Sequence, residues 1–376
     1  MPVVLQVVPR LNSSGGTERG TIDIANALSD AGWGSVVVSE GGPLITQLKR
    51  AKVQHITMPV ASKNPLVIAA NVPRLVKIAR EVQADIIHAR SRAPAWSACF
   101  AAKKSGAHFV TTVQGIYGTK TKMKRFYNSI ITKGEVVIAN SQFTAQHIKS
   151  VYGTSPERIS VIPRGVDLDI FSPGAVTGAR IVNLAERWRI PDGVPVIMLP
   201  GRLTRWKGHE ILIDAIAYLG KKDLCCIFVG EGSTNSSYSR DLQSYITHQG
   251  LGSVVRMVGP CSDMPAAYML ADVVVSASSR PEAFGRVLME AEAMGRPVVG
   301  SNHGGTQETV LDGETGWLFD PGDYRALANS LNQALSISES ARDLLSVRAI
   351  QHVSENFSLI KMCNSTLSVY EKVLEA

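Results

Sequence analysis

The chain has 376 residues, of which 45% are hydrophobic and 19% charged, with five cysteines and a net charge of +7. This composition excludes a collagen, a coiled coil and a wholly disordered chain, and the length favours two domains over one. Five cysteines without a C-x-x-C pair exclude a disulfide scaffold, argue against a thiolate zinc site and suit a reducing cytoplasm. No apolar run reaches the roughly 18 residues that span a bilayer.

The positive charge is unevenly distributed along the chain. Residues 1–172 carry 21 Lys and Arg against 10 Asp and Glu, a net charge of +11, whereas the remainder carries −4. We therefore expect the first half to meet an anionic partner, such as a phospholipid surface, a phosphorylated substrate or nucleic acid. The basic residues are not interleaved with a recognisable RNA- or DNA-binding motif, so nucleic acid is not expected.

The first half alternates short β-rich runs with amphipathic stretches, which predicts βαβ units and a parallel sheet. Its N-terminal apolar run lacks a basic lead and is predicted to be a strand, not a secretory signal. The predicted strands are Val3–Val8, Ser35–Ser39, Asp85–His88, Phe109–Val113 and Val136–Ala139. The predicted helices are Thr17–Ala31, Pro65–Val82, Pro94–Lys104 and Gln142–Tyr152.

The second half repeats this alternation, and Pro173-Gly174 marks the predicted boundary between domains 1–172 and 173–354. Its predicted strands are Val196–Leu199, Leu224–Val229, Val254–Val258, Val273–Ser276 and Pro297–Gly300. Its predicted helices are His209–Leu219, Ser236–Gln249, Met264–Leu270, Arg286–Met294 and Thr306–Leu311, followed by helical character over 322–376. The expected fold class is α/β, with two doubly wound, Rossmann-like domains that bind ligands in a cleft at the C-terminal edges of their sheets.

Two glycine-containing motifs follow predicted strands and open helices. Gly15 and Gly16 precede a helix whose free N–H groups and dipole suit a diphosphate; an ordinary strand-to-helix turn is the alternative. The segment Gly201–Gly208 contains three cations, and Arg202 and Lys207 are the candidates for gripping phosphate oxygens. A solvated basic loop is the alternative here.

Two glutamates, Glu282 and Glu290, lie eight residues apart across a predicted loop and helix. Glu290 lies in an apolar stretch, where a buried carboxylate needs a partner such as a ribose hydroxyl. The loop amides of Ala283, Phe284 and Gly285 could bind sugar hydroxyls. The alternative for Glu290 is a glutamate on the helix surface.

A last glycine-rich loop, residues 300–308, contains His303, which we do not assign to the site because a single loop histidine is usually solvated. No H-x-x-x-H spacing or Asp-x-Asp pair is present, so no metal site is predicted. There is also no G-x-S-x-G elbow and no G-x-x-x-x-G-K-[ST] loop, which argues against an α/β-hydrolase and a P-loop NTPase.

In order and spacing these motifs resemble family 4 of the retaining glycosyltransferases, which have the GT-B fold. The resemblance covers most of the chain: the Gly-Gly-Thr-Glu loop, Gly201–Gly208, the E-x(7)-E signature Glu282 to Glu290, and the run Glu290–Gly300 followed by Gly-Gly-x-x-Glu. It is similar in particular to bacterial enzymes that build lipopolysaccharide core or related cell-surface glycans.

The resemblance implies a role for each candidate residue. Arg202 and Lys207 would neutralise the leaving diphosphate, Glu290 would hold the ribose, and Glu282 with the following amides would hold the donor sugar. Gly16 would let the N-terminal loop approach the phosphates. The first domain would bind the acceptor and the second the donor nucleotide, no cofactor beyond the nucleoside-diphosphate sugar is implied, and the last helix, 355–376, would pack back on the first domain.

One residue departs from the family pattern. After the strand Phe109–Val113 many relatives carry a histidine before the glycine, whereas this chain has Gln114. A glutamine can donate or accept a hydrogen bond but cannot carry a proton between groups. If the histidine only positions the sugar, Gln114 can replace it; if the histidine supplies electrostatic stabilisation, activity is lower or the donor differs.

The excess positive charge of the first domain gathers in residues 117–127, where four cations stand beside Met123, Phe126 and Tyr127. These cations are Lys120, Lys122, Lys124 and Arg125. We expect peripheral contact with the inner face of the cytoplasmic membrane, a solvated loop being the alternative. Arg90 and Arg92 could instead hold acidic groups of the acceptor.

The expected activity is metal-independent, retaining transfer of a hexose from a nucleoside-diphosphate sugar to a cell-envelope glycan or glycolipid, such as lipopolysaccharide core. Two alternatives stay open. Another GT-B enzyme, such as a sugar-nucleotide epimerase, would need an acid–base pair at the donor sugar, and none is obvious. A non-catalytic sugar-nucleotide-binding protein would account for Gln114. The sequence does not specify the donor base, the sugar, the acceptor, the linkage or the oligomeric state.

Overall fold

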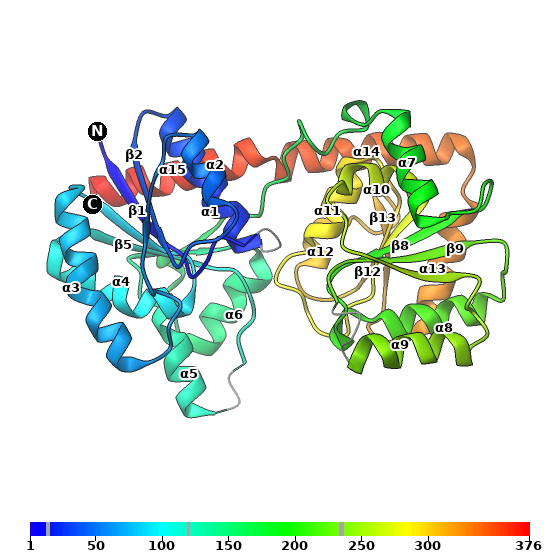
Figure 1. Cartoon of the computed structure of the whole chain (residues 1–376), viewed down its shortest axis with the longest axis horizontal. Helices are drawn as coiled ribbons and strands as arrows, with labels where there is room; N and C mark the ends of the chain where they lie inside the picture. Colours follow the sequence, from blue (N-terminus) through cyan, green and yellow to red (C-terminus); the bar gives the residue numbers. More distant parts are fainter. Residues whose placement is uncertain (13–15, 119–120, 233–236) are drawn as a thin grey trace. The chain divides into compact units, whose positions relative to one another are not determined.

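The computed structural model describes residues 1–12, 16–118, 121–232 and 237–376. The chain forms two compact units (Figure 1). The first unit contains Met1–Gly165 and the C-terminal segment Leu359–Ala376, and the second unit contains Val166–Ser358. Both are α/β units built on parallel sheets, which confirms the predicted fold class.

The division between the units differs from the predicted boundaries at 172 and 354. It falls between Gly165 and Val166, and the chain returns to the first unit at Leu359 instead of residue 355. The reason is that the backbone N–H of Val166 donates to the carbonyl oxygen of Phe357, and the side chains of both residues lie in an apolar cluster of the second unit. Burial of these two side chains therefore places residues 166–172 and 355–358 in the second unit.

The first unit has a seven-stranded parallel sheet in the order β3-β2-β1-β4-β5-β6-β7. Strands β2 and β3 lie on one side of β1, and strands β4 to β7 follow in order on its other side. The strand order therefore reverses between β1 and β4. Apolar residues that are buried on both faces make the central strands, as expected for a parallel sheet covered by helices. The strands are β1 Val3–Val7, β2 Gly34–Ser39, β3 Gln54–Thr57, β4 Ile86–Ala89, β5 His108–Val113, β6 Val136–Ala139 and β7 Ile159–Val161.

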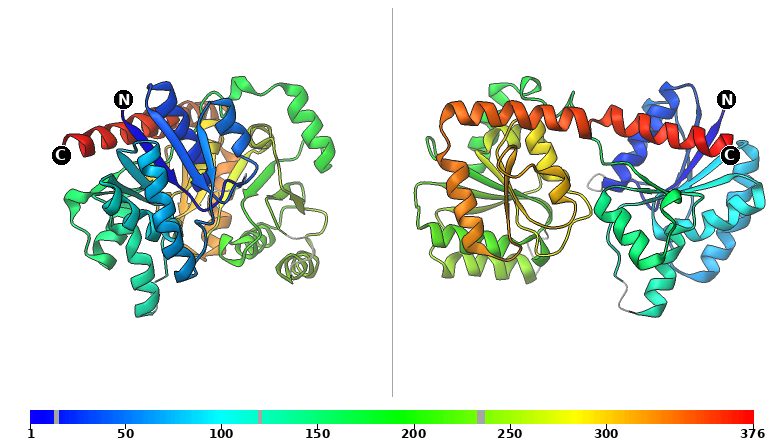
Figure 2. Two further views of the ribbon diagram at one scale, coloured as in Figure 1. Left: turned by 60° about the vertical axis from the view of Figure 1, so that its left-hand side comes forward. Right: turned by 180° about the vertical axis from the view of Figure 1, so that it is seen from behind.

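The helices of the first unit include one from the far end of the chain. They are α1 Gly16–Asp30, α2 Ile45–Arg50, α3 Pro65–Glu81, α4 Arg92–Ser105, α5 Lys122–Ser129, α6 Gln142–Tyr152 and α15 Leu359–Glu375. Helix α15, red in Figure 2, lies beside α1 and the N-terminal strands. It buries Met362, Val369 and Tyr370 against the sheet. The Tyr370 hydroxyl lies 2.6 Å from Nδ1 of the buried His88 in β4.

The second unit has a six-stranded parallel sheet in the order β10-β9-β8-β11-β12-β13, which reverses between β8 and β11. Its strands are β8 Val196–Pro200, β9 Cys225–Val229, β10 Val255–Gly259, β11 Val273–Ser276, β12 Val298–Ser301 and β13 Gly316–Phe319. Its helices are α7 Gly178–Trp188, α8 His209–Leu219, α9 Ser237–His248, α10 Met264–Leu270, α11 Arg286–Ala293, α12 Thr306–Thr309, α13 Tyr324–Ser336 and α14 Glu339–Phe357.

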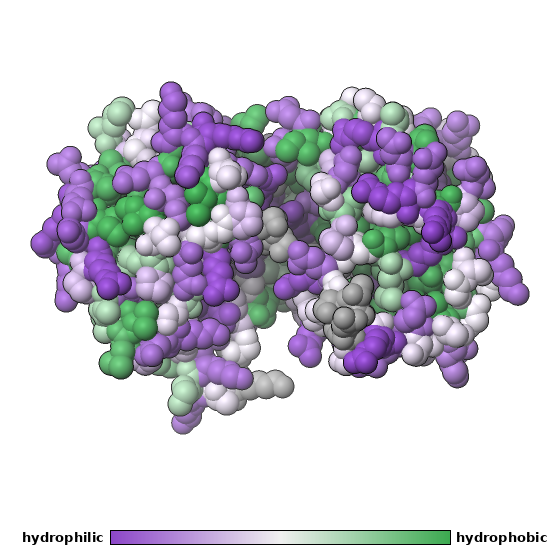
Figure 3. Space-filling model, in the orientation of Figure 1, coloured by the Kyte–Doolittle hydropathy of each residue, from purple (hydrophilic) through white to green (hydrophobic). Residues whose placement is uncertain are grey.

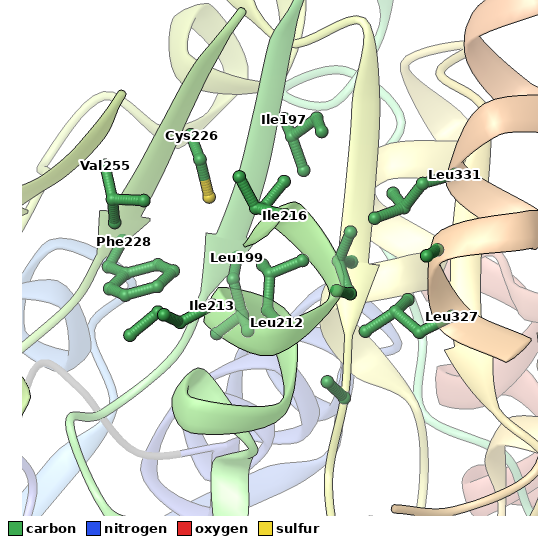
Figure 4. Packing of buried hydrophobic residues seen from close by; sticks show 14 of the residues in the cluster. Ile197, Leu199, Leu212, Ile213, Ile216, Cys226, Phe228, Val255, Leu327 and Leu331 are labelled. Atoms are coloured by element: carbon green, nitrogen blue, oxygen red, sulfur yellow. The ribbon is translucent and has the colours of Figure 1, made fainter. Parts of the chain in front are cut away.

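One apolar core of the second unit lies between the sheet and helices α8 and α13 (Figure 4). Leu199 of β8 and Phe228 of β9 face Leu212 and Ile216 of α8, and Leu331 comes from α13. This packing fixes the C-terminal ends of β8 and β11, from which the functional loops leave. Among the described residues, no helix combines the length and the apolar character that crossing a membrane requires.

Candidate functional site

The loops that follow β8 and β11 pack tightly against each other at the point where the strand order of the second unit reverses. The β8 loop contains a short 3-10 helix, Arg205–Lys207, and turns at Gly208, where φ is +76°. A side chain at Gly208 would overlap the carbonyl oxygen of Ala277, which directly follows β11. The amide of Ser279 donates to the carbonyl oxygen of Trp206 at 2.8 Å. Crevices at such reversals are where doubly wound sheets bind ligands.

A lysine from the first of these loops pairs with a glutamate from the second. The ammonium Nζ of Lys207 lies 2.8 Å from Oε1 of Glu282, and each side chain is only 13% exposed. The hydroxyls of Ser276 and Ser278 also donate to this carboxylate oxygen. The structure thus brings together two residues that the sequence predicted separately, and the ammonium retains two further N–H groups that could meet a phosphate.

The other two cations of the β8 loop have different surroundings. Arg205 forms ion pairs with Glu210 and Asp241, at 3.1 and 2.8 Å, and its side chain is 65% exposed. Arg202 is exposed at the start of the loop. Its role in binding phosphate stays a prediction, whereas Arg205 is engaged by carboxylates of the unit itself.

The second predicted glutamate, Glu290, is buried in α11 as expected, but its partners come from the protein. The hydroxyl of Tyr268 donates to Oε2 and the guanidinium of Arg286 donates to Oε1, each at 2.8 Å. Burial, followed by the nearby carboxylate, raises the pKa of Tyr268, so its hydroxyl keeps its proton and donates. No sequence signal singled out Tyr268, because it lies in an ordinary apolar helix 22 residues before Glu290. The ribose role of Glu290 stays a prediction.

In the segment 283–285, between the two glutamates, the backbone amides and not the side chains are placed to bind a ligand. Phe284 is buried against Phe357, with ring centroids 5.7 Å apart, so its side chain belongs to the core. The hydrogen bonds found among the described residues include none from the amides of Ala283, Phe284 and Gly285. These amides precede the first turn of α11, where N–H groups and the helix dipole favour an electron-rich ligand.

The glycine-rich loop after β12 packs against residues 282–285 and holds their backbone in place. The amide of Gly305 donates to the carbonyl oxygen of Glu282 at 2.9 Å, and an added Cβ at Gly305 would lie 2.6 Å from the carbonyl oxygen of Ala283. His303 joins the same two loops, because its Nε2 lies 2.8 Å from the carbonyl oxygen of Ser278. A carbonyl can only accept, so Nε2 carries a proton, and burial lowers the pKa of His303 and favours its neutral form. His303 therefore holds loops together.

In the first unit, the strand order reverses between β1 and β4. Gly16 begins α1 after β1, and Gly15 lies outside the described residues. Arg90 directly follows β4 but is 5% exposed, and its guanidinium donates to Gln6 Oε1 at 2.9 Å. Burial lowers the pKa of Arg90. The side chain of Arg90 fills space between the strands and α1, and its predicted role in holding acidic groups of the acceptor stays a prediction.

Arg92 is also used by the unit itself. Its guanidinium stacks 3.9 Å from the ring centroid of Tyr117 and donates to Asn128 Oδ1 at 2.8 Å. These contacts fix both ends of the basic segment against α4. Arg92 thus positions that segment, and its predicted role in holding the acceptor stays a prediction.

Gln114 follows β5 at the C-terminal edge of the first sheet. Its Oε1 accepts a hydrogen bond from Arg164, while its Nε2 is buried without a partner among the described residues. An amide N–H without a partner is costly when buried. Gln114 therefore offers a donor that a bound molecule could use.

The basic segment is mostly helical. Thr121 caps the N-terminus of α5 by accepting from the amide of Lys124 at 3.2 Å, and Lys122 and Lys124 are exposed. Arg125 donates to the carbonyl oxygen of Val151, and Lys120 lies outside the described residues. Residues 122–127 of this segment belong to α5 and not to a loop, but Lys122, Lys124 and Arg125 are exposed, so a solvated segment without a partner stays the alternative.

Sequence profiles and solved structures of known glycosyltransferases match this chain. Residues 14–170 match the sequence profile of Glycosyltransferase Family 4, and residues 182–346 match that of Glycosyl transferases group 1. A crystal structure of a glycosyltransferase from Rickettsia africae is 37% identical, with a TM-score of 0.92, over 99% of this chain and 98% of that one. HepE of Anabaena, solved in complex with UDP-glucose, is 25% identical, with a TM-score of 0.85, over 99% of this chain and all of that one.

Among curated proteins, D-inositol 3-phosphate glycosyltransferase 1 of Catenulispora acidiphila is 33% identical over 261 residues. That match covers 66% of this chain, which spans about 60% of the length of this relative. The two parallel-sheet units, with the loops that meet after β8, β11 and β12, define the GT-B class of glycosyltransferase folds. The chain belongs to glycosyltransferase family 4.

Proposed function

We propose that the protein is a retaining, metal-independent glycosyltransferase that moves a hexose from a nucleoside-diphosphate sugar to an anionic glycan or glycolipid of the cell envelope. The observation that carries the proposal is the Lys207–Glu282 pair at the reversal of the strand order in the second unit. The UDP-glucose complex of HepE supports a sugar nucleotide as donor.

In this proposal each part of the donor is bound by a different set of residues. Lys207 and Arg202 neutralise the diphosphate, whose charge grows as the sugar leaves. The carboxylate of Glu282 accepts hydrogen bonds from the sugar hydroxyls, and the amides of residues 283–285 donate to them. Glu290 holds the ribose, using the lone pairs that Tyr268 and Arg286 leave free.

The nucleotide assignment is tested by calorimetry with UDP, GDP and ADP on the wild type and on Glu290→Gln. We expect one of the three to bind, and the variant to bind it about tenfold more weakly, because a neutral amide accepts through a single oxygen. Glu292→Gln is the matched control on the same helix: burial raises the pKa of Glu292 and so favours its neutral carboxyl, and Thr315 donates to it. Equal affinities for all three proteins would contradict the ribose role.

Gln114→His is expected to retain or raise turnover. A neutral imidazole can accept from Arg164 through one nitrogen and donate to substrate through the other, as the amide of Gln114 does with its two ends. Steady-state rates with the best nucleotide sugar measure the effect. Gln114→Glu removes the donor and is expected to lower turnover about tenfold; a folded but inactive Gln114→His protein would show that the site depends on the amide itself.

For the acceptor side, we propose that α5 contacts an anionic membrane. Met123 and Phe126 are exposed on this helix beside Lys122 and Lys124. Each cation near an anionic surface contributes about 1 kcal/mol, and exposed apolar side chains can enter the interface. The curated relatives are named for an inositol phosphate, so a soluble phosphorylated acceptor is the second candidate.

Sedimentation with vesicles that contain anionic lipid separates these two acceptors. Binding is expected at low salt, and should fall as screening increases. Replacing Lys122, Lys124 and Arg125 by Ser should abolish most of it, whereas replacing three other cations of the first unit, Lys49, Arg50 and Lys52, should reduce it much less. A wild-type protein that stays in the supernatant at all salt concentrations would favour the soluble acceptor.

A further inference from the structure

A groove of about 580 Å³ opens on the surface of the first unit between α3, α4 and α5. Ile68 and Val72 of α3, Trp96 and Phe100 of α4, and Met123 and Phe126 of α5 line it. Figure 3 shows hydrophobic side chains, in green, at the surface over α3. The groove lies within the size range of sites that bind one small ligand.

The walls of this groove are apolar and yet reach solvent. Phe100, Met123 and Phe126 are 46%, 81% and 67% exposed. Trp96 lines the groove and is held in place by two contacts. Its ring centroid lies 5.5 Å from that of Phe126, and its indole N–H donates to the carbonyl oxygen of Tyr127 at 3.3 Å. Contiguous exposed apolar surface of this kind marks a binding site.

The rim of the groove is positively charged. Lys63 and Lys104 belong to its lining, and the exposed Lys122 and Lys124 stand on the adjoining helix α5. The sequences of α4 and α5 contain no Asp or Glu. An apolar hollow bounded by ammonium groups is complementary to a molecule with an apolar chain and an anionic head.

We propose that this groove binds one acyl chain of an anionic membrane lipid, with the phosphate of the headgroup against Lys63 and Lys104. The chain lies along Val72, Trp96 and Phe100, and α5 rests on the bilayer from which the lipid is drawn. The inference rests on the proposed membrane contact of α5 and is independent of the nucleotide site. The apolar residues of α3 and α4, which take no part in the donor site, would then bind the lipid.

The test uses alkyl phosphates of 8, 10 and 12 carbons, each below its micelle-forming concentration, titrated into the full-length protein by calorimetry. Because each buried methylene adds a roughly constant free energy, affinity is expected to rise up to about fourfold per methylene. Neutral oligoethylene glycol ethers of the same chain lengths should bind at least fivefold more weakly. An affinity that does not change with chain length would overturn the proposal.

Two neighbouring substitutions on α3 provide a matched pair. Ala69 and Ala70 are both exposed, but only Ala69 lines the groove. Ala69→Trp is expected to fill the groove and to weaken binding of the 12-carbon phosphate at least tenfold, while Ala70→Trp leaves it within twofold of the wild type. Equal effects of the two substitutions would overturn the proposal.

The vesicle and nucleotide measurements keep this inference distinct from the proposed function. If Ala69→Trp sediments with anionic vesicles as the wild type does and the alkyl phosphates do not bind, the membrane contact of α5 stands and the groove proposal fails. Nucleoside-diphosphate affinity should be the same in both Ala→Trp variants, because their effect is confined to the first unit.

Discussion

Lys207→Ala is expected to lower turnover at least ~100-fold while the protein stays folded. The ammonium faces charge that develops on the leaving diphosphate, and removing one such donor costs about 3 kcal/mol of transition-state stabilisation. Among the described residues, the same change leaves the nearly buried carboxylate of Glu282 with the hydroxyls of Ser276 and Ser278 as its hydrogen-bond partners. Steady-state kinetics with the best nucleotide sugar measure the loss, and circular dichroism checks the fold.

The β8 loop contains its own control. Arg205→Ala removes a cation two residues away that is mostly exposed and paired with Glu210 and Asp241. Exposed ion pairs contribute little, so turnover should stay within a factor of about three. Arg202→Ala is expected to resemble Lys207→Ala. If both Lys207→Ala and Arg202→Ala keep near-normal turnover, the phosphate role of this loop is wrong.

Tyr370→Ala is expected to destabilise the first unit by about 3–5 kcal/mol. Its side chain is fully buried between α15 and the sheet, and truncating a large aromatic ring in a core leaves a cavity. Tyr370→Phe keeps the ring but removes the partner of the buried His88 Nδ1, at a cost of about 1–3 kcal/mol. Urea unfolding, following the transition of the first unit, measures both effects.

Lys372→Ala, an exposed change on the same helix, serves as the reference and should stay within about 0.5 kcal/mol of the wild type. Because the protein has two units, the transitions must be resolved before free energies are compared. A Tyr370→Ala protein no less stable than Lys372→Ala would show that α15 does not contribute to the core of the first unit.

The central strands and the edge strand β10 could be predicted from sequence because they are continuous apolar runs, whereas the edge strands β3, β7 and β13 could not. Strand β3, Gln54–Thr57, has exposed Gln54 and Thr57 at its ends and only one apolar residue, and β7 has three residues. Strand β13 has four residues, which are too few for a periodicity. These three short strands are defined by their pairing with the preceding strand and not by their own composition, and a local pattern does not contain that pairing.

In the candidate site, too, some features could be predicted from the sequence and others could not. Lys207 and Glu282 could be singled out because each lies in a loop between an apolar strand and a helix. Their ion pair could not, because β11 returns to the side of β8 only after β9 and β10 have been added on the other side. The donors to Glu290 and the burial of Arg90 likewise depend on packing between elements.

The position of α15 has a consequence for synthesis on the ribosome. The sheet face that buries Val4, Ile86 and Val110 under α15 is translated before the 193 residues of the second unit, and α15 is translated after them. At 5–20 residues per second, that apolar face waits on the order of 10–40 s for its cover. The second unit is continuous in sequence and can complete its core before α15 is made. We therefore expect the first unit to finish folding last, with apolar strands exposed in the nascent chain until then.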